Sequence, residues 1–559
     1  MIRNHLNMFL FLFFSSGVVF AFQYHPTHRT TTANKIATTT SCLEAVVSSS
    51  RQKRVSGLSD WGKETAGIQV ASTVDIKESK ISGGLGLVTN GSGVDTEAGS
   101  VVVTVPASLA LSVELPTGGP DDIGVVKDLV EDRNVFRSLP WYSQFALYFY
   151  KLDKISPYKD QAKDVNLQPW LDSLPRKFTT PIHWDVKERE EWLQYTHMVE
   201  SVERQENSWK DMYSKLQSCC SSRVKDMTWD DFLWGCECAR SRAFSGGYTG
   251  TSFNPFVYAF TFFLVTVYVA LHLGTLEQAA NGAAIVFCVS VLQDFVVPKF
   301  FKSKKYVICP VIDMANHNSL RATANVAYEY FANSYSLSTT SSVPSNTELF
   351  ISYGSRSNDQ LLQYYGFVEQ DNPHDTYVMP PLRDWDIAAL EKACGGIAFP
   401  SGRLQKLDRA GLLGTSLSND AIASSIETGE ETTEDEGLTS AGNPRGGVVL
   451  SRAVGIDPAV IQALRALVSS DEEFEEAGFS VGNFAAEVNP ENERKARIAA
   501  RTAIEMELAS KSTTLEMDRE MLKRVTSSKT GLQEPEELMA IMFRIEKKKL
   551  LKETIDKLQ

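Results

Sequence analysis

The chain has 559 residues, room for three or four domains, and its composition of 43% hydrophobic and 22% charged residues excludes a wholly disordered or fibrous protein. The formal net charge is −13, so no broad basic surface for nucleic acid is expected, because phosphate binding needs clustered Lys and Arg. Eight cysteines in this length do not make a disulfide framework. A mean hydropathy of −0.18 excludes a polytopic membrane protein but leaves room for one or two local spans.

The first sixty residues have the composition of targeting segments. Residues 8–21 form an apolar run too short to span a bilayer comfortably, so residues 1–21 are predicted to be a signal peptide, with a buried first helix as the alternative. Residues 22–60 are rich in Ser, Thr and basic residues and are predicted to be a transit peptide. Phe22 directly follows the expected cleavage point at Ala21, which resembles the two-part presequence of algae with complex plastids. We therefore expect a location in the chloroplast stroma, with the secretory pathway as the alternative.

The rest of the chain alternates between strand-like and helix-like patterns. The β-branched run at 101–106 predicts a strand that ends at proline. Apolar spacings near three, four and seven predict a helical insert over about 139–243. Three further short strands are predicted, at 306–310, 325–330 and 348–353. The last 180 residues are predicted to be all-helical, and an apolar stripe between Leu538 and Leu558 indicates a core-facing helix.

Two segments interrupt this order. An uncharged 19-residue run at 255–273 is long enough to cross the hydrocarbon core, and a second apolar run follows at 279–297. Within the apolar insertion 246–305 these runs predict a membrane hairpin, and thus membrane association through 255–297, although buried helices or a gene-model artefact would give the same pattern. Residues 415–448 carry Ser, Thr, Gly and a run of Glu, and are predicted to be a disordered acidic loop.

The usual signatures of hydrolases and of nucleotide-binding enzymes are missing: there is no HExxH, no GxSxG and no GK[ST]. Cys219, Cys220, Cys236 and Cys238 could suggest a zinc site. However, Cys236 and Cys238 lie two apart on a predicted helix, where their side chains point about 200° apart. We therefore interpret the four cysteines as buried structural residues and expect no metal.

Two other segments carry a chemical signal. The first is PVIDMANHNS at 310–319, and the second is ELFISYG at 348–354, followed by Asn358 and by LLQYYGF at 361–367. An Asn-His pair after an apolar strand, and a strand that ends in Tyr-Gly about 36 residues later, resemble the SET-domain protein methyltransferases. Further segments in the same order are similar to the plastid Rubisco large-subunit lysine methyltransferase group: GLGLV at 84–88, WLDSLP at 170–175, PIHW at 181–184, SRAF at 241–244, TTLEMD at 513–518 and RIEK at 544–547.

This resemblance covers roughly residues 78–559 apart from the two insertions. It implies an α+β fold, with a SET domain of small twisted sheets closed by a pseudo-knot over 78–368 and an all-helical substrate-binding domain over 378–559. It implies a protein-lysine N-methyltransferase that uses S-adenosyl-L-methionine. The implied partner is a folded plastid protein with an accessible lysine, such as the Rubisco large subunit or fructose-bisphosphate aldolase. We expect the chain to act as a monomer.

The resemblance also assigns the site. Tyr353 is implied to be the catalytic tyrosine and to line the substrate channel together with Arg242, Asp313 and Tyr328. The residues implied to hold the cofactor are Gly83, Gly84, Leu85, Arg242, Asn316, His317 and Tyr365. Methyl transfer from a sulfonium needs a neutral amine, a straight approach and a narrow dry channel, and no metal. A cationic cofactor and an apolar channel both lower the pKa of the incoming lysine from about 10.4.

Two positions depart from the family pattern. Gly83 stands where the family often has an acidic residue, and Gly246 stands where an arginine that contacts the substrate often follows. The choice of substrate is therefore expected to differ from Rubisco. Two other functions fit the same residues: histidine methylation, as in a related SET branch that acts on actin, and an inactive SET protein that serves as a membrane-tethered adaptor. The plastid-like presequence argues against actin, and the joint presence of Asn316, His317, Tyr353 and Tyr365 disfavours the adaptor.

Overall fold

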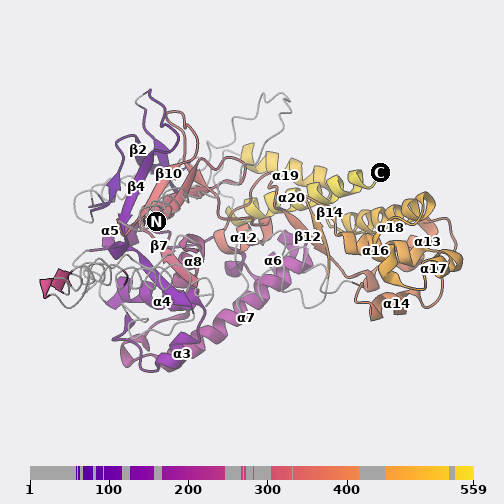
Figure 1. The fold of residues 1–559 in the computed structure, drawn as a ribbon, viewed down its shortest axis with the longest axis horizontal. Coiled ribbons are helices and arrows are strands. Elements are labelled where there is room, and N and C mark those ends of the chain that lie inside the picture. The colour runs from indigo at the N-terminus through magenta and orange to yellow at the C-terminus, as the bar shows by residue number, and fades with distance from the viewer. Residues whose placement is uncertain are drawn as a thin grey trace. The chain divides into compact units, whose positions relative to one another are not determined.

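In the computed structural model shown in Figure 1, small sheets and helices follow one another along the chain as far as β12 (Thr376–Met379), and mainly helices come after it. All of the described residues belong to one unit, Cys42–Gln559. Apart from a few isolated positions, the structure describes residues 67–79, 84–91, 93–115, 126–155, 166–245, 304–329, 332–413, 447–527 and 535–559.

Several sequence predictions lie outside these residues. They are the signal peptide 1–21, the transit peptide 22–60 except Leu58, most of the acidic loop 415–448, and, apart from isolated positions, the two apolar runs 255–273 and 279–297. Within the part of the chain that is described, no helix combines the length and apolar character needed to cross a bilayer.

The largest sheet has four antiparallel strands. In sheet order they are β1 (Gln69–Val70), β4 (Val101–Pro106), β10 (Ser334–Thr339) and β9 (Ala324–Glu329). The strand predicted at 101–106 is confirmed, whereas β10 was not predicted from the sequence. Its Ser-Tyr-Ser-Leu-Ser-Thr sequence is largely buried, and two of its hydroxyls have partners: Ser336 Oγ donates to Glu329 Oε1 at 3.0 Å, and Thr339 Oγ1 donates to the Glu97 carbonyl at 2.6 Å. Buried hydroxyls that are hydrogen-bonded let a polar strand occupy a sheet centre.

A second group of short strands meets at one place, which we call the knot. It comprises the hairpin of β2 (Val74–Glu78) and β3 (Leu85–Thr89), β8 (Asn316–His317), β11 (Phe350–Ile351) and the segment on either side of β11. The β2–β3 hairpin is antiparallel, and β8 pairs in parallel with β11. The segment that leads into β11 also runs beside the hairpin, since the Leu349 N–H donates to the Leu87 carbonyl at 2.8 Å. Three stretches far apart in sequence therefore meet at one place. The strand predicted at 348–353 is shorter than expected, with only Phe350 and Ile351 in ladder geometry.

A three-stranded sheet marks the borders of the apolar insertion. Its order is β5 (Leu111–Leu115), β7 (Lys304–Ile308) and β6 (Phe244–Ser245). Ser245, the last described residue before the insertion, lies opposite Tyr306 in the β6–β7 pair. The chain thus leaves and re-enters this sheet on adjacent strands.

Helices make up most of the described residues in the stretch predicted as a helical insert, about 139–243. The helices of this region are α3 (Arg133–Arg137), α4 (Trp141–Tyr150), α5 (Gln168–Ser173), α6 (Val186–Leu193), α7 (Thr196–Cys219) and α8 (Trp229–Arg242). A capping box between Thr228 and Asp231 begins α8. Cys236 and Cys238 lie on α8 and are buried without disulfide bonds, as are Cys219 and Cys220.

The region after the knot is mainly helical but not entirely so. After α12 (Asn358–Tyr365), its helices are α13 (Ile387–Ala393), α14 (Arg403–Arg409), α16 (Pro458–Val468), α17 (Asp471–Glu476), α18 (Pro490–Ala509), α19 (Leu515–Ser527) and α20 (Pro535–Lys557). A sheet of β12 (Thr376–Met379), β13 (Val448–Ser451) and β14 (Gly455–Ile456) joins them, so the all-helical prediction for 378–559 is wrong. A short apolar run such as 448–451 fits a strand or a buried helix equally well. Val448 also begins β13, so the acidic loop ends before it.

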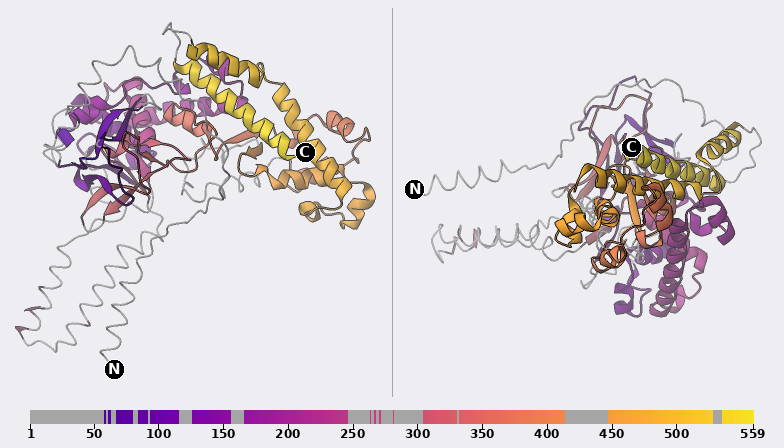
Figure 2. Two further views of the ribbon diagram at one scale, coloured as in Figure 1. Left: turned by 90° about the horizontal axis from the view of Figure 1, so that it is seen from above. Right: turned by 90° about the vertical axis from the view of Figure 1, so that its right-hand side faces the viewer.

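The C-terminal helix α20 is buried on more than one face. Figure 2 shows it alongside α19, and it also contacts α6, α12 and all three strands of the β12–β13–β14 sheet. Its buried residues include Arg544, Lys547 and Lys548 as well as apolar residues. The predicted single apolar stripe is therefore only part of the packing, because the charged residues of this helix are buried with carboxylate partners.

The crossing of α4 and α8 generates a prediction about stability. A Cβ added to Gly235 on α8 would lie 2.7 Å from the Cα of Ala146 on α4, a backbone atom that cannot move aside. We expect Gly235→Ala to lower the free energy of unfolding by about 1–3 kcal/mol through overpacking. Chemical denaturation of the two proteins measures this difference. The control is Gly482→Ala, whose Cβ would meet only Ser480 Oγ at 3.5 Å. Equal effects of both substitutions would contradict the steric explanation.

Candidate active site

Five elements converge on the knot: the β2–β3 hairpin, the C-terminal end of α8, β8, the segment after β11, and the C-terminal end of α12. The residues that the sequence assigned to the cofactor, to catalysis or to the substrate channel come from these elements and from the short 3₁₀ helix Ile312–Met314 before β8, which carries Asp313. The exception is Tyr328, which lies on β9 of the four-stranded sheet. Gly83 lies outside the described residues.

Asn316 ties the hairpin to the knot. Its Nδ2 donates to the Leu85 carbonyl at 3.0 Å and to Glu348 Oε1 at 2.7 Å. The second Glu348 oxygen accepts from Ser79 Oγ at 2.9 Å. Burial raises the pKa of the Glu348 carboxyl, against the lowering effect of these two hydrogen bonds. Glu348 was missed as a site residue in the sequence, where nothing distinguishes it from an ordinary residue at the start of a strand.

The glycine-rich turn fits closely against this contact. The Ser79 N–H donates to the Gly84 carbonyl at 2.8 Å, which closes the hairpin. A Cβ on Gly86 would lie 2.4 Å from Glu348 Oε1 and 3.1 Å from Asn316 Nδ2. Position 86 therefore has no room for a side chain while the Asn316–Glu348 hydrogen bond is in place.

Tyr353 lies between two other rings. Its ring is stacked on His317 and on Tyr365, with both centroid separations at 5.0 Å. Its hydroxyl donates to the Ala315 carbonyl at 2.9 Å, and its backbone N–H donates to His317 Nδ1 at 3.0 Å. Burial raises the pKa of the Tyr353 phenol above its ordinary value. The hydroxyl is therefore protonated at neutral pH and acts as a hydrogen-bond donor.

Arg242 and Asp313 form a buried ion pair beside this stack. Arg242 Nη1 lies 2.9 Å from Asp313 Oδ2, which also accepts from Trp170 Nε1 at 3.1 Å. Burial raises the pKa of the Asp313 carboxyl, although Arg242 and these hydrogen bonds oppose the shift. Two buried atoms of the pair, Arg242 Nε and Asp313 Oδ1, have no hydrogen-bond partner among the described residues. A buried polar atom without a partner is costly, so these two point to a ligand or a water.

Tyr328 is the residue that the structure does not bring to this cluster. Its hydroxyl donates to Asn333 Oδ1 at 2.8 Å, and its ring lies 5.1 Å from that of Tyr335. Tyr335 in turn meets Phe244, two residues beyond Arg242, at 5.8 Å. Among the contacts of the described residues, none joins Tyr328 directly to Tyr353. Its place in the substrate channel stays a prediction.

No group of three or more His, Cys, Asp or Glu side chains within the described ranges is arranged to hold a metal ion. The site presents hydrogen-bond donors, aromatic rings and the Arg242–Asp313 pair.

Comparison with solved structures decides the fold. The SET domain of LSMT bound to lysine and AdoHcy matches with a TM-score of 0.53 at 17% sequence identity, over 91% of this chain and 91% of that one. Rubisco LSMT bound to AdoMet matches with a TM-score of 0.52 at 18% identity, over 90% and 91%. The fold is that of Rubisco LSMT. The family model described as Rubisco LSMT substrate-binding matches residues 421–551 as well. The α+β class, the SET domain and the resemblance stated from the sequence are thereby confirmed.

The relatives found by sequence match shorter stretches. The ribosomal lysine N-methyltransferase set10 of Schizosaccharomyces pombe is 21% identical over 234 residues, which are 40% of this chain and 33% of that protein. The human N-lysine methyltransferase SETD6 is 40% identical over 72 residues, which are 12% of this chain and 15% of that protein. The chain therefore spans a third or less of the length of these curated relatives.

The Arg242–Asp313 pair generates a prediction about how stability depends on pH. Replacing Arg242 by Gln leaves Asp313 buried without its cation, so we expect a loss of about 3 kcal/mol in the free energy of unfolding at neutral pH. A carboxyl whose folded-state pKa is raised binds more protons folded than unfolded, so its destabilising effect grows as the pH rises above its ordinary pKa. The loss should therefore be larger at pH 7.5 than at pH 5. Denaturation at both pH values measures it, and Arg242→Gln/Asp313→Asn should lose less and show no such pH dependence.

Proposed function

We propose that this chain is a protein-lysine N-methyltransferase that uses S-adenosyl-L-methionine. The observation that carries the proposal is the position of Tyr353, whose hydroxyl is held on the Ala315 carbonyl one residue before the Asn-His pair. It lies in a fold whose solved representatives are described as bound to AdoMet, AdoHcy, lysine or monomethyllysine. The names of set10 and SETD6 point to lysine as well.

The residues present fit this cofactor. Arg242 Nε is buried, charged and without a partner among the described residues, which suits a carboxylate. Gly84, directly before β3, is half-buried and has no side chain, so a ligand can approach its backbone closely. The Tyr353–Tyr365 stack offers an aromatic surface to a cation. When bound, the cofactor would supply a methyl group on a sulfonium to a neutral amine.

The chain's own residues would then orient the incoming amine and exclude water from it. Tyr353 is held in place by its backbone N–H, its hydroxyl and two ring contacts, so its phenol presents a fixed dipole to the incoming nitrogen. Because burial keeps that phenol protonated, it is no general base, and the proton of the amine leaves to water. The Arg242–Asp313 pair keeps a buried charge balanced beside this nitrogen.

The substrate is, in this proposal, a folded plastid protein such as the Rubisco large subunit or a stromal enzyme like fructose-bisphosphate aldolase. The match of residues 421–551 to the Rubisco LSMT substrate-binding family supports docking by the C-terminal region. The two-part composition of residues 1–60 supports import into a plastid, and residues 255–297 would associate with a membrane. We propose that the chain acts as a monomer.

Tyr353→Phe separates catalysis from binding. We expect the variant to bind S-adenosyl-L-methionine as tightly as the parent protein in calorimetry, and to lose about a hundredfold or more in kcat, because one oriented dipole is removed. Tyr213→Phe is a matched control. Tyr213 lies on α7, and its hydroxyl also donates to a backbone carbonyl, that of Met227, at 2.6 Å. A parent protein that fails to bind the cofactor would rule out the enzyme and favour an adaptor.

Labelled methyl transfer identifies the substrate. We expect a chloroplast extract, given the protein and labelled cofactor, to show label in a soluble stromal protein, on lysine by mass spectrometry. Label on histidine would replace the lysine assignment. In parallel, a fusion of residues 1–60 to a fluorescent reporter should enter the plastid of an alga with complex plastids, and a secreted reporter would contradict the stromal location.

A further inference from the structure

The carboxylate of Glu369 lies behind the Tyr353–His317 stack and has no role in the site as assigned above. Glu369 Oε1 accepts from the Ser319 N–H at 2.7 Å, and Oε2 accepts from Ser319 Oγ at 2.7 Å. Ser319 Oγ also lies 3.1 Å from His317 Nε2, and Glu369 Oε2 lies 3.5 Å from the same nitrogen. The His317 side chain is fully buried and that of Glu369 is nearly so. Both therefore depend on one another for hydrogen bonds.

The directions of these hydrogen bonds follow from chemistry alone. An ionised carboxylate only accepts, so the Ser319 hydroxyl must donate its proton to Glu369. Ser319 Oγ is then an acceptor, and His317 Nε2 must carry a proton to reach it. A neutral imidazole has one proton, so His317 Nδ1 is left bare. That is the state Nδ1 needs, because the backbone N–H of Tyr353 donates to it at 3.0 Å.

The ionised state of Glu369 is itself supported by this arrangement. Burial opposes ionisation, but the hydrogen bonds from His317 and Ser319 hold the pKa of the Glu369 carboxyl below its usual range. At neutral pH the Glu369 carboxylate only accepts hydrogen bonds. The donors therefore run in one direction, from His317 Nε2–H to Ser319 and from the Ser319 hydroxyl to Glu369.

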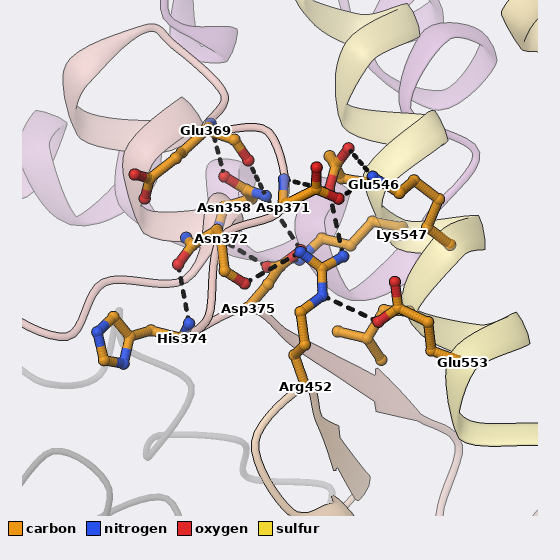
Figure 3. Close-up of polar contacts among 12 residues, drawn as sticks. Asn358, Glu369, Asp371, Asn372, His374, Asp375, Arg452, Glu546, Lys547 and Glu553 are labelled. Atoms are coloured by element: carbon orange, nitrogen blue, oxygen red, sulfur yellow. Dashed lines mark hydrogen bonds and ion pairs between the residues drawn. The ribbon is translucent and has the colours of Figure 1, made fainter. Parts of the chain in front are cut away.

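The backbone of Glu369 is anchored from the C-terminal region. Asn358 Oδ1 accepts from the Glu369 N–H at 2.9 Å, and its Nδ2 donates to the Glu369 carbonyl at 3.0 Å. Asp375 holds Asn358, and Lys547 of α20 donates to Asp375 Oδ1 at 2.8 Å. Figure 3 shows this sequence of contacts, with Arg452 and Glu546 beside it. Asn358, Asp375 and Lys547 are all buried, so the anchor is rigid.

We propose that Glu369 is a positioning residue for Tyr353: through Ser319 it selects the Nε2–H tautomer of His317, and His317 in turn holds the Tyr353 backbone. The inference about turnover rests on the proposed methyltransferase function, whereas the inference about the tautomer does not. The backbone of Glu369 is fixed through Asn358 and Asp375 to Lys547, so α20 supports the tyrosine from a distance.

The His317 tautomer is a direct test that requires no activity. Two-bond proton–nitrogen spectra of protein labelled at its eight histidines distinguish Nε2–H from Nδ1–H imidazoles, and the spectrum of His317→Gln assigns the signal. The expected result for the parent protein is Nε2–H with a bare Nδ1. An Nδ1–H or doubly protonated His317 at neutral pH would overturn the proposal, whether or not any variant folds.

Glu369→Gln is the decisive variant. The amide is nearly isosteric with the carboxylate but can also donate, so it no longer fixes the direction of the hydrogen bonds between Glu369, Ser319 and His317. We expect a mixture of His317 tautomers and a fall in kcat of about tenfold or more, from one weakened hydrogen bond to the tyrosine. Asp371→Asn is the matched control in the same loop: it removes the carboxylate that pairs with Lys549 and should change neither readout.

Ser319→Ala distinguishes positioning from packing. It removes the Ser319 hydroxyl but leaves Glu369 Oε2 3.5 Å from His317 Nε2, close enough to accept a hydrogen bond from Nε2–H directly. We therefore expect Nε2–H to persist in this variant, with a smaller loss of kcat than in Glu369→Gln. A Glu369→Gln protein whose His317 remains wholly Nε2–H would refute the proposal at any activity. A parent protein without methyl transfer, but with the expected tautomers, would refute the proposed function alone.

Discussion

The parallel pairing of two short strands, Asn316–His317 with Phe350–Ile351, is the constraint on which the site depends. Parallel strands need a connection that crosses back, and here the connection contains β9 and β10 of the largest sheet. The pairing places the Asn-His pair beside the Ser-Tyr-Gly segment. Only this juxtaposition lets His317 receive the Tyr353 N–H while Asn316 reaches Leu85 and Glu348. Two ladder residues on each strand are a weak element alone, so the side-chain hydrogen bonds across the knot are what stabilise it.

Buried charges connect the LSMT-like knot to the C-terminal helices. Lys547 contacts both Asp359 and Asp375, and its partners belong to α12 and to the loop after it. Burying such an ion pair costs free energy because both charges lose water, and breaking it costs more because one charge is left buried without a partner. The pair therefore fixes one arrangement of the helices more than it adds stability. The SET domain and the helical region therefore share one polar core. Movement of α20 relative to α12 would displace Asn358 and Glu369, and through them Tyr353.

The sequence allowed the fold class and much of the site to be predicted, because these depend on local patterns. The strand at 101–106 and the helix that carries Cys236 and Cys238 follow from residue type and spacing. Glu348 and Glu369 could not be found in this way, since a carboxylate is recognised as important only by its partners. Ser79 lies 269 residues from Glu348, and Lys547 lies 172 residues from Asp375. The strand β10 was missed because Leu337 is its one aliphatic residue and its other buried residues are Ser, Tyr and Thr.

The neighbouring strands β6 and β7 have a consequence for how this chain tolerates extra sequence. Ser245 faces Tyr306, so whatever lies between them begins and ends at almost the same point in space. The entropy of closing such a loop rises only with the logarithm of its length, so lengthening it by tens of residues costs little. Added sequence at this border leaves the pairing of β6 with β7 intact, so this part of the fold can accommodate an insertion at little cost in stability.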